Sequence, residues 1–331
     1  MDWTGILSDG LRAGLGINAA VYALAAVGLN VQFGYAGLWN FGQAGFLLVG
    51  GYGTAIAVNS WGLWLPWAVL VGVAASILLG LLLGIPTLRL RGDYLAIVTI
   101  AAAEILRIVV NSTKVQSVTG GPQGIGGFAN WFFDHNPIAR GRYGFGTITY
   151  DQRQLWVTLV TWALVALASV LIAMLVHSPW GRVVRAIRED EDAVRSLGKN
   201  VYSYKMQALL IGGAIGGIAG IMLVFDQQFI QPDLFESAIT FYAFAALILG
   251  GTARIFGPIL GAIAFWFLVE GADSFLGHAV DHNFLGVGHL IDPTQVGTFR
   301  FVLVGLVIML LVIFRPQGFL GSRQEVMLGE Q

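Results

Sequence analysis

The strongest constraint in this sequence is a stretch of 76 consecutive residues, 13–88, that contains no Asp, Glu, Lys or Arg. One helical crossing of a bilayer needs about 20 apolar residues, so this stretch alone has room for three crossings. Of the 331 residues, 56% are hydrophobic and 11% are charged, against about 25% charged in soluble domains. The sequence therefore predicts an all-α, polytopic membrane protein.

Further apolar windows follow this uncharged stretch. Each window predicts a helix, because a helix satisfies all of its own backbone hydrogen bonds in lipid. The 45 glycines suit close helix packing, since lipid gives no hydrophobic drive between helices and small residues let backbones approach. We expect about eight to ten spans in one transmembrane domain, residues 1–331. The windows are residues 13–31, 38–59, 63–85, 93–111, 154–176, 206–225, 237–253, 255–275 and 297–314.

Basic residues predict the orientation, because short loops rich in Lys and Arg stay on the cytoplasmic side. The decisive loop is 177–205, whose basic residues are Arg182, Arg185, Arg188, Arg195, Lys199 and Lys205. With this loop inside, residues 112–153, 226–236 and 276–296 lie outside, and nine full crossings put the N-terminus outside as well. The same orientation places inside Arg89, Arg91, Arg254, Arg315 and Arg323.

Composition also excludes several function classes. The chain has no cysteine, and therefore no disulfide, thiol nucleophile or Cys-ligated metal site. A net charge of −1 argues against nucleic acid as a partner, because phosphate contacts need clustered Lys and Arg. His278 and His282 have the spacing of helical metal ligands, but they fall in a glycine-bearing outer loop without a His-Glu-x-x-His string. We expect no metal site.

The most informative hydrophilic segment is 178–204. Pro179 precedes a helical pattern, and Gly198 is the residue type that ends a helix in the left-handed conformation. The pattern between them predicts one amphipathic helix that can fit the groove of a cytoplasmic partner. The alternative is a solvated loop that only sets topology. The predicted apolar stripe is Val184, Ile187, Val194 and Leu197, and the charged residues at three- and four-residue spacing are Arg185, Arg188, Glu189 and Asp192.

Within this segment, Asp192-Ala193-Val194 followed by Gly198 resembles the Glu-Ala-Ala, three residues, Gly signature of ABC-transporter permeases. The longer string 178–204 is similar to the LivM-type permease subunit of branched-chain amino-acid ABC transporters. Two departures are Asp192, which is a shortened acid, and Gln43, where many relatives have His. The resemblance covers about residues 20–320. Other stretches that resemble the family in the same order are residues 34–37, 41–46, 88–94, 119–122, 249–251 and 257–262.

The resemblance implies half of a translocation pore in the cytoplasmic (inner) membrane of a bacterium or archaeon, surrounded by lipid. It implies three kinds of partner: a homologous LivH-type permease, two cytoplasmic ABC ATPases and an extracytoplasmic solute-binding protein. The residues expected to couple to the ATPases are Arg185, Arg188, Glu189, Asp192, Ala193 and Gly198. No cofactor is expected on this chain, because its one Gly-Lys pair, 198–199, lacks the rest of a P-loop. ATP and Mg²⁺ are expected on the partner ATPases.

Amides and glycines interrupt the apolar sequence at residues 30–43. Helix breaks at membrane depth expose backbone groups that can line a solute path, so we predict a discontinuous helix here. The alternative is an ordinary turn between two spans. The residues that we place in the translocation pathway are Trp39, Asn40, Phe41 and Gln43. A faint echo links residues 37–42 with 251–257, since both end in Phe-Gly.

Two pairs of ionisable residues lie within apolar windows. Glu104 and Arg107 are three residues apart on one helical face, which makes them either a functional intramembrane pair or a structural pair. Glu270 and Asp273 are like charges at the same spacing, and we expect them to meet interfacial water.

Together these observations predict a transmembrane permease subunit of an ABC importer for branched-chain or other neutral amino acids. No bond chemistry is expected of this chain. One alternative is a permease of the same architecture for urea or short-chain amides. Another is an ion-coupled secondary carrier, for which Glu104 is the plausible ion site. A membrane enzyme has neither a zinc signature nor a Gly-x-Ser-x-Gly nucleophile in view.

Overall fold

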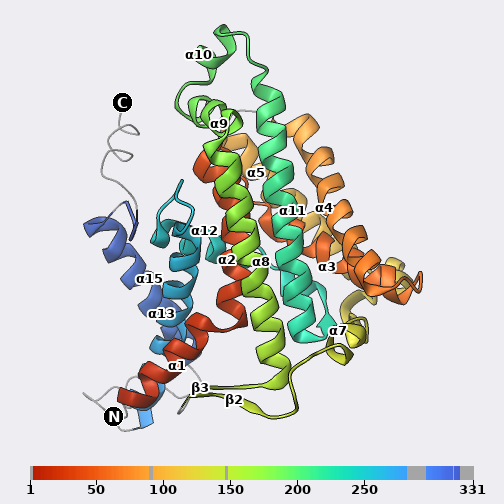
Figure 1. Cartoon of the computed structure of the whole chain (residues 1–331), viewed down its shortest axis with the longest axis vertical. Coiled ribbons are helices and arrows are strands. Elements are labelled where there is room, and N and C mark those ends of the chain that lie inside the picture. Colours follow the sequence, from red (N-terminus) through yellow and green to blue (C-terminus); the bar gives the residue numbers. More distant parts are fainter. Residues whose placement is uncertain (1–2, 89–91, 146–147, 282–295, 316, 321–331) are drawn as a thin grey trace.

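The computed structural model of the chain describes residues 3–88, 92–145, 148–281, 296–315 and 317–320. Over these residues the protein is a bundle of long helices, so the predicted all-α membrane fold is confirmed (Figure 1). Each of the nine predicted windows falls on a helix. Four residues named in the sequence predictions lie outside the described residues: Arg89, Arg91, His282 and Arg323.

Six stretches are long and apolar enough to cross a membrane, namely residues 17–35, 65–87, 152–177, 201–227, 232–250 and 257–280. A seventh crossing forms if Asp93–Asn111 and Thr113–Thr119, which meet at 61°, make one bent span. The protein is thus a multi-pass membrane protein. Its main helices are α1 Trp3–Leu15, α2 Ile17–Leu29, α3 Gln43–Asn59, α4 Leu65–Thr87, α5 Gly92–Asn111, α8 Gln152–His177, α11 Val201–Gln227, α12 Ala238–Gly250, α13 Gly257–Asp281 and α15 Val296–Phe314.

Short elements connect these helices. Two small antiparallel pairs of strands are present, one joining Ile125 to Ile230 and the other joining Tyr143 to Tyr150. The strands are β1 Ile125–Gly126, β2 Arg142–Phe145, β3 Ile148–Asp151 and β4 Phe229–Ile230. The short helices are the π-helix η1 Asn30–Tyr35, η2 Thr113–Val115, α6 Gln116–Thr119, η3 Gly121–Gln123, α7 Asn130–Asp134, α9 Pro179–Glu189, α10 Glu191–Ser196 and η4 Pro232–Phe235.

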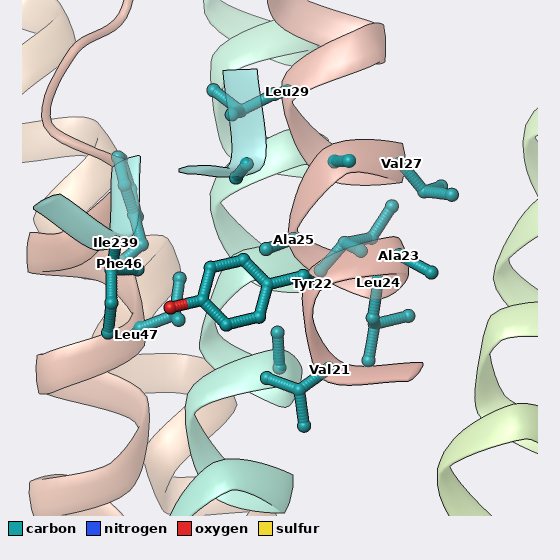
Figure 2. Close-up of a cluster of buried hydrophobic side chains, with 14 of the residues drawn as sticks. Val21, Tyr22, Ala23, Leu24, Ala25, Val27, Leu29, Phe46, Leu47 and Ile239 are labelled. Atoms are coloured by element: carbon teal, nitrogen blue, oxygen red, sulfur yellow. The ribbon is translucent and has the colours of Figure 1, made fainter. Parts of the chain in front are cut away.

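The helix α2 forms the centre of the bundle. Every residue from Ala19 to Leu29 is buried, as expected for a helix that is apolar all round. The helices α8, α11, α12 and α13 all pack against it. Figure 2 shows the α2 side chains in this core together with Phe46 and Leu47 of α3 and Ile239 of α12.

Glycines bring α2, α3 and α11 into backbone contact. A Cβ atom at Gly28 would lie 2.5 Å from the carbonyl oxygen of Gly212, and one at Gly220 would lie 2.0 Å from the carbonyl oxygen of Leu47. No larger residue fits at these crossings without moving a helix. The close helix packing that the glycine content predicts is therefore present at these crossings.

The two ends of the bundle carry different segments. The helices α9 and α10 lie at one end, and α7 with the β2–β3 hairpin lies at the other (Figure 1). We call these the inner and outer ends, following the orientation that the basic loop predicts. In the chain's last described residues, the amides of Phe319 and Leu320 donate to the carbonyls of Leu249 and Gly250 at the end of α12.

Candidate coupling and pathway site

The predicted amphipathic helix of residues 178–204 is in fact two helices, α9 and α10. Ser178 caps α9 by accepting from the amide of Trp180. Asp190 then adopts an extended conformation and caps α10 by accepting from the amide of Ala193 at 2.9 Å. The expectation of one continuous helix was wrong, because the short Asp190 side chain favours a cap over a helix interior.

This break also corrects the predicted apolar stripe. Val184, Ile187 and Val194 are buried as predicted, and the last two pack with Val201. Leu197 is instead 80% exposed. Residues before and after Asp190 do not share one helical phase, so the spacing that joined Leu197 to the stripe does not apply.

Two of the predicted coupling residues face the bundle. The guanidinium of Arg188 donates through Nη1 to the carbonyl oxygen of Gly34 in η1, and its side chain packs on Gly37. Arg185 donates through Nη2 to the carbonyl of Val176 at 2.8 Å and lies 5.9 Å from the ring centroid of Tyr35. Both arginines therefore connect α9 to the bundle, and Arg188 reaches the π-helix directly.

The other predicted coupling residues point away from the bundle. Glu189, Asp192 and Ala193 are exposed, and Gly198 has the left-handed conformation that the sequence predicts, with φ of 74°. Asp192 accepts from Arg195 at 3.1 Å. Together with exposed Leu197, these residues form the free surface of the α9–α10 segment.

The predicted pathway residues separate into two groups. Trp39 is 48% exposed and Phe41 is half-buried, whereas Asn40 and Gln43 have no exposed surface. Asn40 donates to the side-chain oxygen of Gln32 at 2.7 Å, and Gln32 donates to the carbonyl of Leu209 at 3.1 Å. The amides predicted to face a solute thus lie inside a hydrogen-bonded cluster between η1, α3 and α11.

Asn30 extends this cluster to the segment after α12. Its side chain donates to the carbonyl of Arg254 and accepts from the amide of Ala253, both at 2.8 Å. The segment after α12, which ends in Phe-Gly, therefore contacts the start of η1 through Asn30. Asn30 and Gln32 were missed as site residues, although their position inside an uncharged apolar run was a signal, because a buried amide needs partners. We call Asn30, Gln32, Asn40 and Gln43 the amide cluster.

Aromatic rings surround the exposed side of this break. Phe33 meets Trp39 edge-on, with centroids 5.2 Å apart, and Phe41 lies 4.8 Å from Phe244. Phe41 also lies 5.7 Å from Phe241, which is half exposed on α12. We call these five residues the aromatic face. Trp39 and Phe241 are its exposed members, Phe33 and Phe41 are partly buried, and Phe244 is buried.

Glu104 and Arg107 form the predicted pair. Arg107 donates to both carboxylate oxygens of Glu104, at 2.6–3.1 Å, and its other nitrogen donates to Asp233 in η4 at 3.1 Å. Asp233 was missed because it is 126 residues away in the sequence. The pair thus joins α5 to η4, which favours the structural interpretation.

Comparison with known proteins identifies the family. Residues 13–313 match the model of a family described as the permease component of branched-chain amino acid transport systems. The chain belongs to this family. It is 35% identical to the high-affinity branched-chain amino acid transport system permease protein LivM of Salmonella typhimurium, over 91% of this chain and 68% of LivM.

Two further relatives show the breadth of this permease family. The probable branched-chain amino acid transport permease LivH of Methanocaldococcus jannaschii is 26% identical over 83% of this chain and 84% of its own length. The ribose import permease RbsC of Escherichia coli is 28% identical over 61% of this chain and 60% of its own length. Permeases named for different solutes are therefore similar in sequence to this chain.

Among the residues that the structure describes, no three His, Cys, Asp or Glu side chains are grouped so that they could hold a metal ion. His278 lies with Nδ1 2.8 Å from the carbonyl oxygen of Ser274, one turn earlier on α13. The second predicted histidine, His282, lies outside the described residues.

Proposed function

We propose that this permease is one transmembrane subunit of an ABC importer for branched-chain amino acids in the cytoplasmic membrane. It pairs with a homologous, LivH-like permease, two ATPases bind at the inner end, and a solute-binding protein docks at the outer end. The chain itself carries out no bond chemistry, and ATP and Mg²⁺ bind to the ATPases. The similarity to both LivM and LivH supports a pore built from two related chains.

The observation that carries this proposal is the contact between Arg188 of α9 and the Gly34 carbonyl of η1. A π-helix is a locally strained, rare form that often occurs at functional sites. Here it lies between the central helix α2 and the aromatic face. A displacement of α9 would therefore move η1, the irregular segment at the end of the first span.

The transport cycle follows from this arrangement. The ATPases bind the free surface of the α9–α10 segment, whose exposed residues include Asp192, Ala193 and Leu197. When they close on ATP, α9 moves, and Arg188 moves η1 and the following residues with it. Trp39 then shifts relative to Phe241, and the pathway alternates between outward and inward access.

The aromatic face supports an apolar solute side chain. Trp39, Phe41 and Phe241 present uncharged aromatic rings. Such rings suit contact with the aliphatic side chain of an amino acid that moves along the pathway. The amide cluster lies behind these rings and stabilises the break by hydrogen bonds. Its residues are positioning residues rather than solute contacts.

Reconstitution tests the proposal. The tagged chain is co-expressed with its homologous permease and ATPases, placed in proteoliposomes and supplied with binding protein and radiolabelled leucine. We expect ATP-dependent uptake in which isoleucine and valine compete with leucine and urea does not. Uptake by this chain alone and without ATP would instead establish a secondary carrier, and competition by urea alone would establish the amide-permease alternative.

A further inference from the structure

A polar cavity with a volume of about 210 Å³ opens between α1, α2, α8 and α13, next to β3 at the outer end. Its lining includes Asp9, Arg12, Asn18, Thr158 and Glu270. None of its lining residues belongs to the amide cluster, the aromatic face or the α9–α10 segment, so it is separate from the coupling and pathway site.

Glu270 is the central feature of this cavity. Its carboxylate is half-buried within α13, and among the described residues it has no hydrogen bond and no ion pair. The charged groups around it are Asp9, Arg12, Asp273 and Arg300. Asp273 is already paired with Arg300 at 3.2 Å, and Asp9 accepts from Ser274 at 3.0 Å. A carboxylate within a membrane span normally has a partner, so Glu270 offers an open acceptor.

Thr158 independently points to a ligand. It is 6% exposed, it lines the cavity, and its hydroxyl has no hydrogen-bond partner among the described residues. Buried polar groups are nearly always bonded. Thr161, one turn deeper on the same helix, shows the usual solution, because its hydroxyl donates to the carbonyl of Val157 at 2.7 Å.

Arg12 supplies positive charge at the mouth of the cavity. Its guanidinium lies 5.7 Å from the ring centroid of Tyr150, and the Tyr150 hydroxyl donates to the Arg12 carbonyl at 2.7 Å. Burial raises the pKa of Tyr150, so the phenol keeps the proton that it donates. No carboxylate among the described residues forms an ion pair with the Arg12 side chain. It is available to an anion.

The helix α1 places this cavity beside lipid. Four large apolar residues at four-residue spacing, Trp3, Leu7, Leu11 and Leu15, form an exposed stripe along α1. Its buried face packs on α13 through Gly10 and Gly14. A helix with one apolar exposed face and a terminal Trp suits the membrane interface.

We propose that this cavity binds a primary ammonium group that is covalently linked to an anion. The ammonium donates to the Glu270 carboxylate and the Thr158 hydroxyl, and the anion meets Arg12. Two sources share this chemistry: the phosphoethanolamine headgroup of an outer-leaflet lipid and a free amino acid. The position of the α1 stripe favours the lipid. This site is independent of the proposed transport function.

Native mass spectrometry of the full chain in nanodiscs of equal phosphatidylethanolamine and phosphatidylcholine tests the lipid source. Phosphatidylcholine has the same charges but no N–H donor on its nitrogen. We expect selective retention of phosphatidylethanolamine, reduced about tenfold or more in Glu270→Gln and Thr158→Val, since a charge-assisted hydrogen bond is lost. The matched control Thr161→Val, on the same helix as Thr158, should retain it, because the Thr161 hydroxyl already bonds to the Val157 carbonyl.

A thermal-shift titration with L-leucine in delipidated detergent tests the amino-acid source. A stabilisation that Glu270→Gln abolishes would support the same site with a soluble ligand. The comparison of the two lipids on the unmodified chain needs no variant, so a folding defect does not obscure the result. Equal retention of both lipids, together with no leucine-dependent shift, would overturn the proposal.

Discussion

The amide cluster and the α9–α10 segment are the two polar regions at the inner half of an otherwise apolar protein, and they differ in burial. The four amides of the cluster are at most 2% exposed and bond to one another and to backbone groups of α11 and of the residues after α12. The α9–α10 segment exposes its carboxylates and Leu197. Burial therefore separates polar residues that hold the break in the first span from those that are free to meet a partner.

Arg188 joins the two regions by a direct hydrogen bond. Gly34 belongs to η1, next to the amide cluster, and its carbonyl accepts from Arg188 of α9. Arg185 lies beside this contact, over the ring of Tyr35 in the same π-helix, so α9 and η1 are held together by two arginines of which Arg188 makes the hydrogen bond. The predictions below compare the same substitution in each region.

The largest difference should come from glycine substitution. A Cβ atom in Gly212→Ala would lie 2.4 Å from the Gly28 carbonyl and 2.6 Å from Gln32, so we expect a loss of about 3 kcal/mol. Gly198→Ala meets nothing within 4 Å and suffers only the left-handed conformation, about 1 kcal/mol. Thermal unfolding midpoints in one detergent compare the two. Equal destabilisation would contradict the difference in packing.

Removal of an asparagine should have the next largest effect. Asn30→Ala removes the side chain that bonds to the Arg254 carbonyl and the Ala253 amide, and the loss of these two buried hydrogen bonds costs about 2 kcal/mol. Asn200→Ala removes an exposed helix cap at the start of α11, which costs about 1 kcal/mol or less. The same unfolding assay applies. A larger loss at Asn200 would show that the cluster does not stabilise the break.

The connection between the regions should affect activity more than stability. Arg188→Gln removes a charge-assisted hydrogen bond to Gly34, and we expect binding-protein-stimulated ATPase activity to fall about tenfold while the assembled complex is still recovered. Arg195→Gln is the matched control, because the Arg195 side chain pairs with Glu191 and Asp192 of its own helix. Full stimulation in Arg188→Gln would remove Arg188 from the coupling route.

The smallest structural effect is expected at Asp192. Its ion pair with Arg195 is highly exposed, so Asp192→Asn should change the free energy of unfolding by less than about 0.5 kcal/mol. Affinity for the ATPases, measured by titration of the detergent-solubilised permease, should nevertheless fall. If affinity is unchanged, Asp192 is not part of the docking surface.

Several features were predictable from local pattern. The uncharged run at residues 13–88 predicted membrane helices. Gly198 was predicted as a left-handed helix end and is one. In each case the physical cause lies within a few residues of the feature.

Other features depended on distant neighbours. Asp190 ends α9 because its side chain caps α10. The amphipathic pattern continues across this position and therefore did not reveal the break. Asn40 and Gln43 are polar residues at a helix break, but whether they face solute or helix depends on α11, whose Leu209 and Gly212 carbonyls accept from Gln32 and Gln43.

The sequence by itself determined the class of this protein: a helical membrane permease, from its charge distribution, its glycines and the motifs that it shares with its family. Hydrophobicity and local backbone preference act along the chain and can be read from it. Only the tertiary structure decided which polar residues are buried, that Arg188 turns inward to η1, and that Glu270 and Thr158 share a cavity. These contacts depend on packing between segments more than 100 residues apart. The spacing of residues along one helix does not predict them.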